Sequence, residues 1–236
     1  MRKISIIHPS RNRPELASRA AKRWLSAADG DVEYILSLDK DESMVSEYFN
    51  KFMDILDRVK VVYNENTSAI DAINNSVQYT TGDILIVVSD DFDCPDSWDT
   101  KFLEAVGDQT DILVKTWDGV QDWIITLPIM DRAYYNRFGY IYYPEYRHMF
   151  ADTEMTHVGD LLGRTIKIDM EFIHRHYTVG GMTRDDINRK NDSTWGQGEL
   201  LYIQRLQTNF GIEKMCGKLN CHPGHYKWLE SKGVYL

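Results

Sequence analysis

The stretch Ile84-Leu-Ile-Val-Val-Ser-Asp-Asp-Phe-Asp93 decides the fold. Its unbroken apolar start predicts a strand that is covered on both faces, as in the middle of a parallel sheet. The carboxylates of Asp90, Asp91 and Asp93 follow directly, so we expect them at the carboxyl end of this strand. Ligands of open α/β folds bind at that end. The stretch therefore predicts both a central strand and a candidate binding site.

Strands and helices alternate on both sides of this stretch. The predicted strands are short apolar runs at 4–8, 32–38, 59–63, 84–88, 111–115 and 165–170. The predicted helices have apolar residues at roughly helical spacing and lie at 15–28, 44–56, 68–79, 97–106 and 152–162. This alternation predicts an α/β fold with a mostly parallel sheet sandwiched by helices.

The second part of the chain lacks this regular alternation. Residues 117–150 are rich in Trp and Tyr without a clear period, which predicts a mixed region built onto the first part. Residues 177–198 hold four glycines and few apolar anchors, so we expect a long mobile loop. Long loops in compact domains often act as lids over a site. A length of 236 residues with 43% hydrophobic residues fits one continuous domain.

The net charge of -9 argues against general nucleic-acid binding, which normally needs an excess of Lys and Arg. The sequence has no apolar stretch near the roughly 20 residues of a membrane span, and its first apolar run is too short for a signal peptide. Three cysteines, unevenly spaced, do not suit a disulfide framework. We therefore expect a soluble, cytoplasmic protein.

Neighbouring carboxylates repel one another unless a cation neutralises them, and hard oxygen ligands favour Mg²⁺ or Mn²⁺. Such an ion can bridge a diphosphate and stabilise it as a leaving group. The alternative is that Asp90, Asp91 and Asp93 form a solvated turn, where Asp is common. Their place after the most apolar strand favours the metal site.

Several motifs occur in a fixed order around the aspartates. Ile6 to Arg13 ends in Pro-Ser-Arg-Asn-Arg, Thr81-Gly82-Asp83 precedes the apolar strand, and Asp91-Phe92-Asp93 has Asp-x-Asp spacing. In these motifs the sequence resembles the inverting, nucleotide-sugar-dependent glycosyltransferases of family 2, which have the GT-A fold. The resemblance covers about residues 3–176. It implies a GT-A-like, Rossmann-like sheet, with a donor-binding half at 1–110 and an acceptor-binding half with a C-terminal lid at 111–236.

The resemblance also implies site residues and a cofactor, Mn²⁺ or Mg²⁺. The donor, a nucleotide-diphosphate sugar with UDP-sugars favoured, would be bound by Pro9, Ser10, Arg11, Arg13, Asp39, Asn66, Asn74, Asp90 and Asp91. The metal ligands would come from Asp91, Asp93, His174 and His176. A separate expectation is that Arg184, in the glycine-containing loop, closes over the diphosphate and excludes water.

An inverting transfer needs a general base that removes a proton from the acceptor hydroxyl. The segment from Ala151 to Met155 resembles the family's Glu-Asp-x-x-hydrophobic segment, which implies Asp152 as the base and leaves Glu154 as a second candidate. Ala151 departs from the pattern, where a Glu is usual. The alternative role for Asp152 is to cap a helix. The acceptor, a carbohydrate or another hydroxyl on a lipid, protein or modified base, stays open, as does the oligomeric state.

Two other functions compete with sugar transfer. A nucleotidyltransferase of similar layout would have a glycine-rich phosphate loop, but residues 9–14 contain no glycine. A non-catalytic nucleotide- or carbohydrate-binding module would be expected to lose the carboxylates, which are present. Near the C-terminus, Cys216, Cys221, His222 and His225 do not match a standard zinc spacing, so their pattern alone predicts no zinc site.

Overall fold

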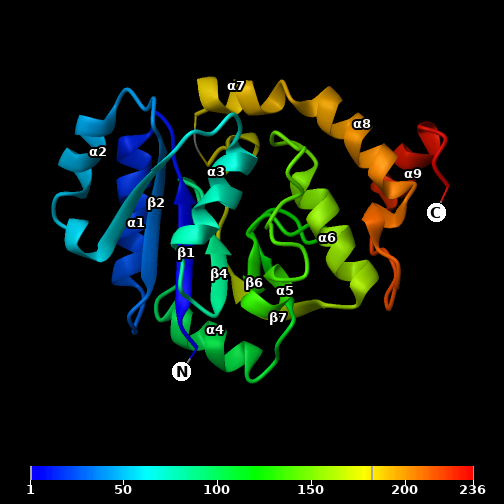
Figure 1. Ribbon diagram of the computed structural model, residues 1–236, viewed down its shortest axis with the longest axis horizontal. Coiled ribbons are helices and arrows are strands. Elements are labelled where there is room, and N and C mark those ends of the chain that lie inside the picture. Colours follow the sequence, from blue (N-terminus) through cyan, green and yellow to red (C-terminus); the bar gives the residue numbers. More distant parts are fainter. Residues whose placement is uncertain (1, 182, 236) are drawn as a thin grey trace.

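A single sheet runs through the computed structural model, which describes residues 2–181 and 183–235 (Figure 1). Its strand order is β3-β2-β1-β4-β6-β5-β7. The strands are β1 (Ile4–Pro9), β2 (Glu33–Asp39), β3 (Val59–Asn64), β4 (Ile84–Val87), β5 (Leu113–Trp117), β6 (Ile129–Asp131) and β7 (Thr165–Glu171). β6 pairs antiparallel with both β4 and β5, whereas the other pairings are parallel. The predicted α/β class with a mostly parallel sheet is confirmed.

Helices cover both faces of this sheet. They are α1 (Pro14–Ser26), α2 (Val45–Phe52), α3 (Ala69–Ser76), α4 (Trp98–Val106), α5 (Arg132–Tyr135), α6 (Ala151–Leu162), α7 (Asp186–Asp192), α8 (Trp195–Leu206) and α9 (Pro223–Ser231). The core residues of α1, α2 and α4 form one apolar cluster, and those of α3, α5, α6, α8 and α9 form another. The two clusters lie on opposite faces of the sheet, because successive strand residues point to opposite sides.

β4 lies in the middle of the sheet, as predicted. Ile84 and Ile86 belong to one apolar cluster, and Leu85 and Val87 belong to the other. All four side chains are buried. A strand that is covered on both faces reads as a continuous apolar run, which is why its sequence alone located it.

Two segments differ from the sequence-based expectation. β6 lies in the predicted mixed region, but its three residues are too few to show a period. The predicted loop 177–198 contains α7 and the start of α8, so it is not one long loop, although Met182 lies outside the described residues. α7 begins at a capping box in which the Asp185 side chain accepts from the backbone of Asn188, and the Asn188 side chain accepts from that of Asp185.

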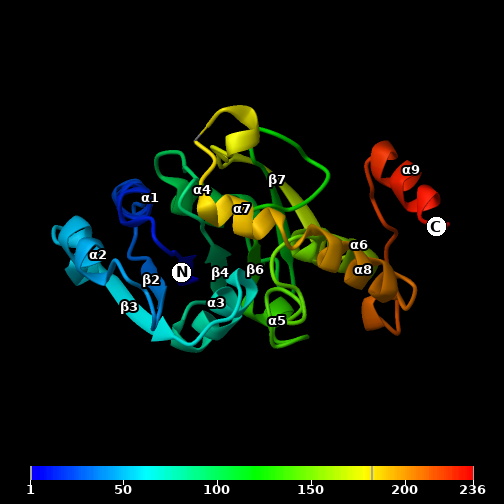
Figure 2. The same ribbon diagram turned by 90° about the horizontal axis from the view of Figure 1, so that it is seen from above.

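α7 and α8 run across the end of the sheet where the parallel strands stop (Figures 1 and 2). α9 lies at the edge of the molecule, close to the C-terminal end of the chain (Figure 2). Among the described residues, none of the helices combines the length and apolar character needed to cross a bilayer.

Candidate active site

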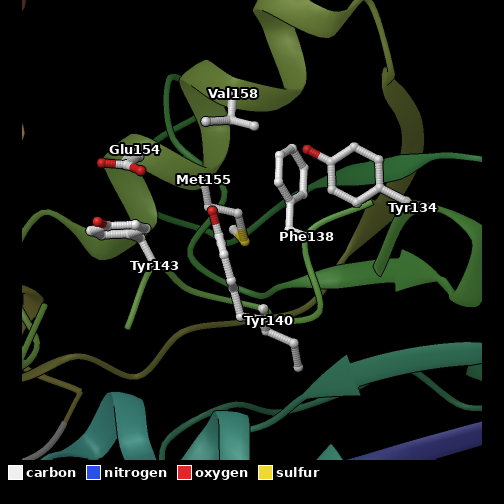
Figure 3. Close-up of a pocket in the computed structure, with 8 residues that line it drawn as sticks. Tyr134, Phe138, Tyr140, Tyr143, Glu154, Met155 and Val158 are labelled. Carbon is white, nitrogen blue, oxygen red and sulfur yellow. The ribbon is translucent and has the colours of Figure 1, made fainter. Parts of the chain in front are cut away.

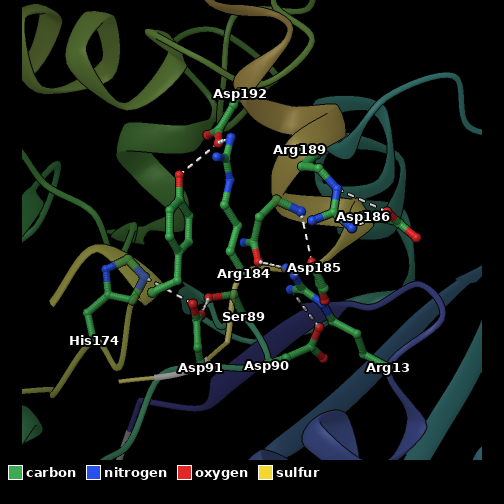
Figure 4. Close-up of polar contacts among 12 residues, drawn as sticks. Arg13, Ser89, Asp90, Asp91, His174, Arg184, Asp185, Asp186, Arg189 and Asp192 are labelled. Carbon is green, nitrogen blue, oxygen red and sulfur yellow. Dashed lines mark hydrogen bonds and ion pairs between the residues drawn. The ribbon is translucent and has the colours of Figure 1, made fainter. Parts of the chain in front are cut away.

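The candidate site lies at the carboxyl ends of β1, β2 and β4, which are neighbours in the sheet. Arg13 follows β1, Asp39 ends β2, and Asp91 follows β4. His174 joins them from the segment after β7, where it forms an isolated antiparallel bridge with Phe92. The sheet order therefore brings residues that are far apart in the sequence to one end of the sheet, as Figure 4 shows for Arg13, Asp91 and His174.

Asp91 and His174 face each other. The Oδ2 of Asp91 is 3.3 Å from the Nε2 of His174, and Ser89 Oγ donates to Asp91 Oδ1 at 2.5 Å (Figure 4). The His174 ring stacks on Phe92 at 4.3 Å, which fixes its orientation. Burial alone would raise the pKa of Asp91, but hydrogen bonding and charge from His174 hold it well below its usual value. The ionised carboxylate and the imidazole could hold a divalent cation.

The other predicted metal ligands are placed differently. Asp93 pairs with Arg175 at 2.8 Å and with Arg23 at 3.3 Å. The His176 ring lies 5.0 Å from that of His174, but its Nδ1 is 2.7 Å from Thr178 Oγ1. The contacts thus favour Asp91 and His174 as ligands, whereas ligation by Asp93 stays a prediction that its ion pairs do not support.

Asp90, next to Asp91 in the sequence, is also buried. Its Oδ1 is 3.0 Å from His8 Nε2, and its Oδ2 is 3.6 Å from Arg13 Nη1. With His8 on one side and Arg13 on the other, Asp90 is held by partners within the protein.

A second polar group gathers where the nucleotide base was expected. Arg11 pairs with Asp39 and donates to both carboxylate oxygens of Asp41 at 2.9 and 3.0 Å. Asn66 Nδ2 donates to Asp39 Oδ1 at 2.7 Å. These charges raise the pKa of Arg11 above its usual value. The structure thus brings Arg11, Asp39 and Asn66 together, and their binding of the nucleotide stays a prediction.

Three residues that were predicted to bind the sugar donor make contacts that stabilise the fold. Asn74 donates to the carbonyl of Tyr142 at 2.7 Å and accepts from its backbone N–H at 3.2 Å, so it ties α3 to a loop. Ser10 Oγ is buried 2.7 Å from Tyr48 Oη. Pro9 ends β1 and pairs with Ser37 in the sheet. Direct donor contacts by these side chains stay a prediction.

The segment around α7 closes one side of the site. Asp185 accepts two hydrogen bonds from Arg13, from Nε and Nη2, both at 2.7 Å (Figure 4). Arg184 Nη2 lies 2.5 Å from Asp192 Oδ2. Arg13 and Arg184 were predicted from the sequence as donor-binding residues, but Asp185 was not. The capping box formed by Asp185 and Asn188 is a sequence signal for the start of α7.

Asp152 lies in the first turn of α6. Burial raises its pKa, while the hydrogen bond from the Thr153 backbone, at 2.8 Å, and the charge of His174 oppose this. Asp152 is not the N-cap residue of α6, which is Phe150 with φ 71°. Its side chain nevertheless accepts from a backbone N–H of the first turn, and its role as the base stays a prediction.

Glu154, the second candidate base, is held elsewhere on α6. It accepts from Arg205 Nε at 2.7 and 2.8 Å and from Tyr146 Oη at 2.8 Å. It faces a different, aromatic pocket (Figure 3). The pocket is lined by Tyr134, Phe138, Tyr140, Ile141, Tyr143, Glu154, Met155 and Val158. These contacts argue against Glu154 as the base.

His148 is a histidine that no sequence motif singles out. Burial lowers its pKa to about 4, and the charges of Asp192 and Asp91 partly oppose this. The imidazole is therefore neutral near pH 7.

The comparisons with known proteins identify the family. The model of glycosyl transferase family 2 matches residues 5–172. The chain belongs to this family. The prediction that this chain is a glycosyltransferase resembling family 2 is thus confirmed. The match ends two residues before His174, so the segment that completes the site lies outside it. No curated protein sequence matches significantly.

Solved structures of family-2-like transferases share the fold. Glucosyl-3-phosphoglycerate synthase from Mycobacterium tuberculosis, in complex with Mn²⁺, UDP and phosphoglyceric acid, is 14% identical with a TM-score of 0.60, over 90% of this chain and 80% of that one. A mannosyltransferase from Pyrobaculum calidifontis, in complex with GDP-Man and Mn²⁺, is 12% identical with a TM-score of 0.58, over 89% and 73%. GalNAc-T7, with UDP, GalNAc and Mn²⁺, is 12% identical with a TM-score of 0.62, over 100% and 55%. At these identities the likeness shows the GT-A fold, confirming the predicted architecture.

Proposed function

We propose that this family 2 glycosyltransferase moves a sugar from a nucleotide-diphosphate donor to an acceptor hydroxyl, with inversion and with the help of Mn²⁺ or Mg²⁺. The observation that carries the proposal is the ionised Asp91 facing His174 at 3.3 Å, at the carboxyl end of the central strand. Support for a UDP-sugar as donor comes from the synthase and GalNAc-T7, which were both solved with UDP.

The donor set at Asp91 and His174 suits a divalent cation. One carboxylate oxygen and one imidazole nitrogen favour Mn²⁺ over Mg²⁺, which takes mostly oxygen ligands. A bound cation would neutralise the charge that develops on the diphosphate leaving group. Ser89 keeps one oxygen of Asp91 occupied by a hydrogen bond, so Oδ2 is the oxygen left to ligate.

Asp152 is the proposed base. In its ionised form it accepts the proton of the acceptor hydroxyl while the sugar leaves the diphosphate from the opposite side. Support for this role comes from its position in the first turn of α6, where burial raises its pKa and the charge of His174 opposes this. Glu154 is excluded from this proposal because Arg205 and Tyr146 occupy its oxygens.

The donor would lie across the ends of β1 and β2. Arg11, Asp39 and Asn66 provide donors and acceptors for the nucleotide base and ribose, in the half 1–110. Arg13 and Arg184 lie on the other side and would contact the diphosphate once their partners Asp185 and Asp192 release them. The acceptor would bind against residues 111–236.

The test compares two aspartates of the same loop by titration calorimetry of UDP with and without Mn²⁺. Wild type should bind UDP far more tightly with Mn²⁺, Asp91→Asn should lose that dependence, and Asp93→Asn should keep it. UDP binding that ignores Mn²⁺ in wild type would overturn the metal site. If only Asp93→Asn loses the Mn²⁺ dependence of UDP binding, Asp93 rather than Asp91 is the metal ligand.

The donor can be identified by thermal stabilisation with a panel of nucleotide sugars and Mn²⁺. The expected result is a higher melting temperature with one UDP-sugar. If every nucleotide sugar leaves it unchanged, the proposal fails in favour of a binding module.

A further inference from the structure

A second group of metal-ligating side chains lies away from the active site. It consists of His157 from the middle of α6, Cys221 just before α9, and His225 in the first turn of α9. One candidate ligand atom from each lies within 4.8 Å of the other two. All three residues are buried. The fold thus concentrates one thiol and two imidazoles at a single interior point.

This group differs from the sequence pattern near the C-terminus. Cys216 is exposed. The side chain of His222 is the N-cap of α9, where it accepts from Gly224 N. Only Cys221 and His225 of that pattern point inward, and the third member comes from a helix 64 residues earlier in the chain. Spacing rules for consecutive ligands could not find such a group.

The distances suit a small tetrahedral ion. Cys221 Sγ is 3.2 Å from His157 Nε2. In a tetrahedral zinc site, bonds of about 2.3 Å to sulfur and 2.0 Å to nitrogen separate the two ligand atoms by roughly 3.5 Å. The two side chains therefore need only a small adjustment to share one ion.

Tyr202 supplies the outer contact that metal-bound histidines usually have. Its Oη is 2.7 Å from His157 Nδ1 and 3.0 Å from His225 Nε2. Because Tyr202 contacts Nδ1 of His157, the other ring nitrogen, Nε2, is the one that faces Cys221. Trp123 packs its ring 5.3 Å from the His225 ring and covers the group on one side.

The ligand types select the ion. Thiolate and imidazole ligands favour Zn²⁺, whereas Mg²⁺ and Mn²⁺ take oxygen. The group is thus chemically distinct from the carboxylate-containing site at Asp91.

α9 packs on the core through a small apolar face. Of its nine residues, only His225 and Leu229 are buried, and the half-buried Trp228 stacks its ring on that of Phe150 at 5.5 Å. The segment before it, from Glu213 to Asn220, has exposed or half-buried side chains throughout. A bond between α9 and α6 would therefore add to the attachment that this small face provides.

We propose that His157, Cys221 and His225 bind one Zn²⁺, with a water in the fourth position, and that this ion fastens α9 to α6. The Cys221 thiol gives up its proton on binding. Because α6 also carries Asp152 at its start, the ion would steady the helix that presents the base. The competing account is a metal-free cluster in which Cys221, His157 and Tyr202 only hydrogen-bond to one another.

Cobalt distinguishes the two accounts, because a thiolate ligand gives Co²⁺ a charge-transfer absorption band. Co²⁺ is titrated into full-length protein freed of metal with a chelator, and Zn²⁺ is then added. One equivalent of Co²⁺ should produce the band and Zn²⁺ should abolish it. Co²⁺ at Asp91 has no sulfur ligand and does not contribute. Tyr202→Phe should weaken Co²⁺ binding by about 10–100-fold, as expected for an outer-shell partner.

Cysteine variants provide the matched control. Cys221→Ser should remove the band, and Cys216→Ser should keep it, with the fold of each checked by far-UV circular dichroism. Folded wild type that shows no band at saturating Co²⁺ refutes the proposal, as does a band that survives in Cys221→Ser. Should Cys221→Ser fail to fold, the zinc content of wild type after dialysis, one ion per chain or none, decides.

Discussion

The buried pair between Glu154 and Arg205 makes the sharpest stability prediction. Glu154 is 3% exposed, and two of its three side-chain hydrogen bonds come from Arg205 Nε. Arg205→Met keeps most of the apolar stem but leaves a buried carboxylate with only the phenol of Tyr146. Removing one partner of a buried ion pair costs about 3–5 kcal/mol. For a chain of this size, that lowers the melting temperature by about 6–20 °C.

The loss should depend on pH. Burial already raises the pKa of Glu154, and Arg205 opposes this. Without Arg205 the folded-state pKa rises further above the unfolded one, so the variant is most stable below the unfolded pKa. It loses stability as the pH rises through the folded-state value.

Urea unfolding followed by tryptophan fluorescence measures both effects. Arg189→Met is the matched control, because Arg189 pairs with Asp186 at the surface, where both side chains are more than half exposed. The double variant Glu154→Gln/Arg205→Met should recover part of the loss, since no charge remains buried. If Arg205→Met is no less stable than Arg189→Met at neutral pH, Glu154 is not held as described and regains its place as a candidate base.

Three further predictions concern catalysis and backbone packing. Asp152→Asn should lower kcat by about 10²–10⁴-fold with an unchanged donor Kd, and equal rates in variant and wild type would remove Asp152 as the base. Because burial raises the pKa of Asp152, kcat in wild type should rise with pH through a value above that of an ordinary Asp; a pH-independent kcat would contradict this. Gly82→Ala should cost about 1–3 kcal/mol in urea unfolding, since its Cβ would lie 2.7 Å from Ser5 N and 2.9 Å from Lys3 O. Gly196→Ala, with no heavy atom within 4 Å, should instead leave stability equal or raise it by up to about 1 kcal/mol.

The sequence predicted the central strand and its acidic end because both depend on local signals. β4 is apolar on both faces, and Asp91 follows it directly, so periodicity and sheet geometry were enough. Arg11 and Asp39 were predicted from the resemblance to the family, and the structure places them at the ends of adjacent parallel strands. The existence of these elements did not depend on distant contacts.

Other features depend on contacts between distant segments, which no local pattern records. The different surroundings of Asp91 and Asp93 follow from which side chain Arg175 reaches. The exclusion of Glu154 follows from Arg205 on a helix that the sequence analysis did not predict. His157 stands in no motif, and only the packing of α6 against α8 and α9 gives it partners.

β6 enters the sheet out of sequence order. It comes after β5 in the chain but lies between β5 and β4, and it closes the open edge of β4 with only three residues. While the chain emerges from the ribosome, the most apolar strand therefore keeps an unpaired edge until residue 131 is available. Such edges invite pairing with other chains. Nascent chains that stop between β5 and β6 should consequently be the most prone to aggregate and the most dependent on chaperones.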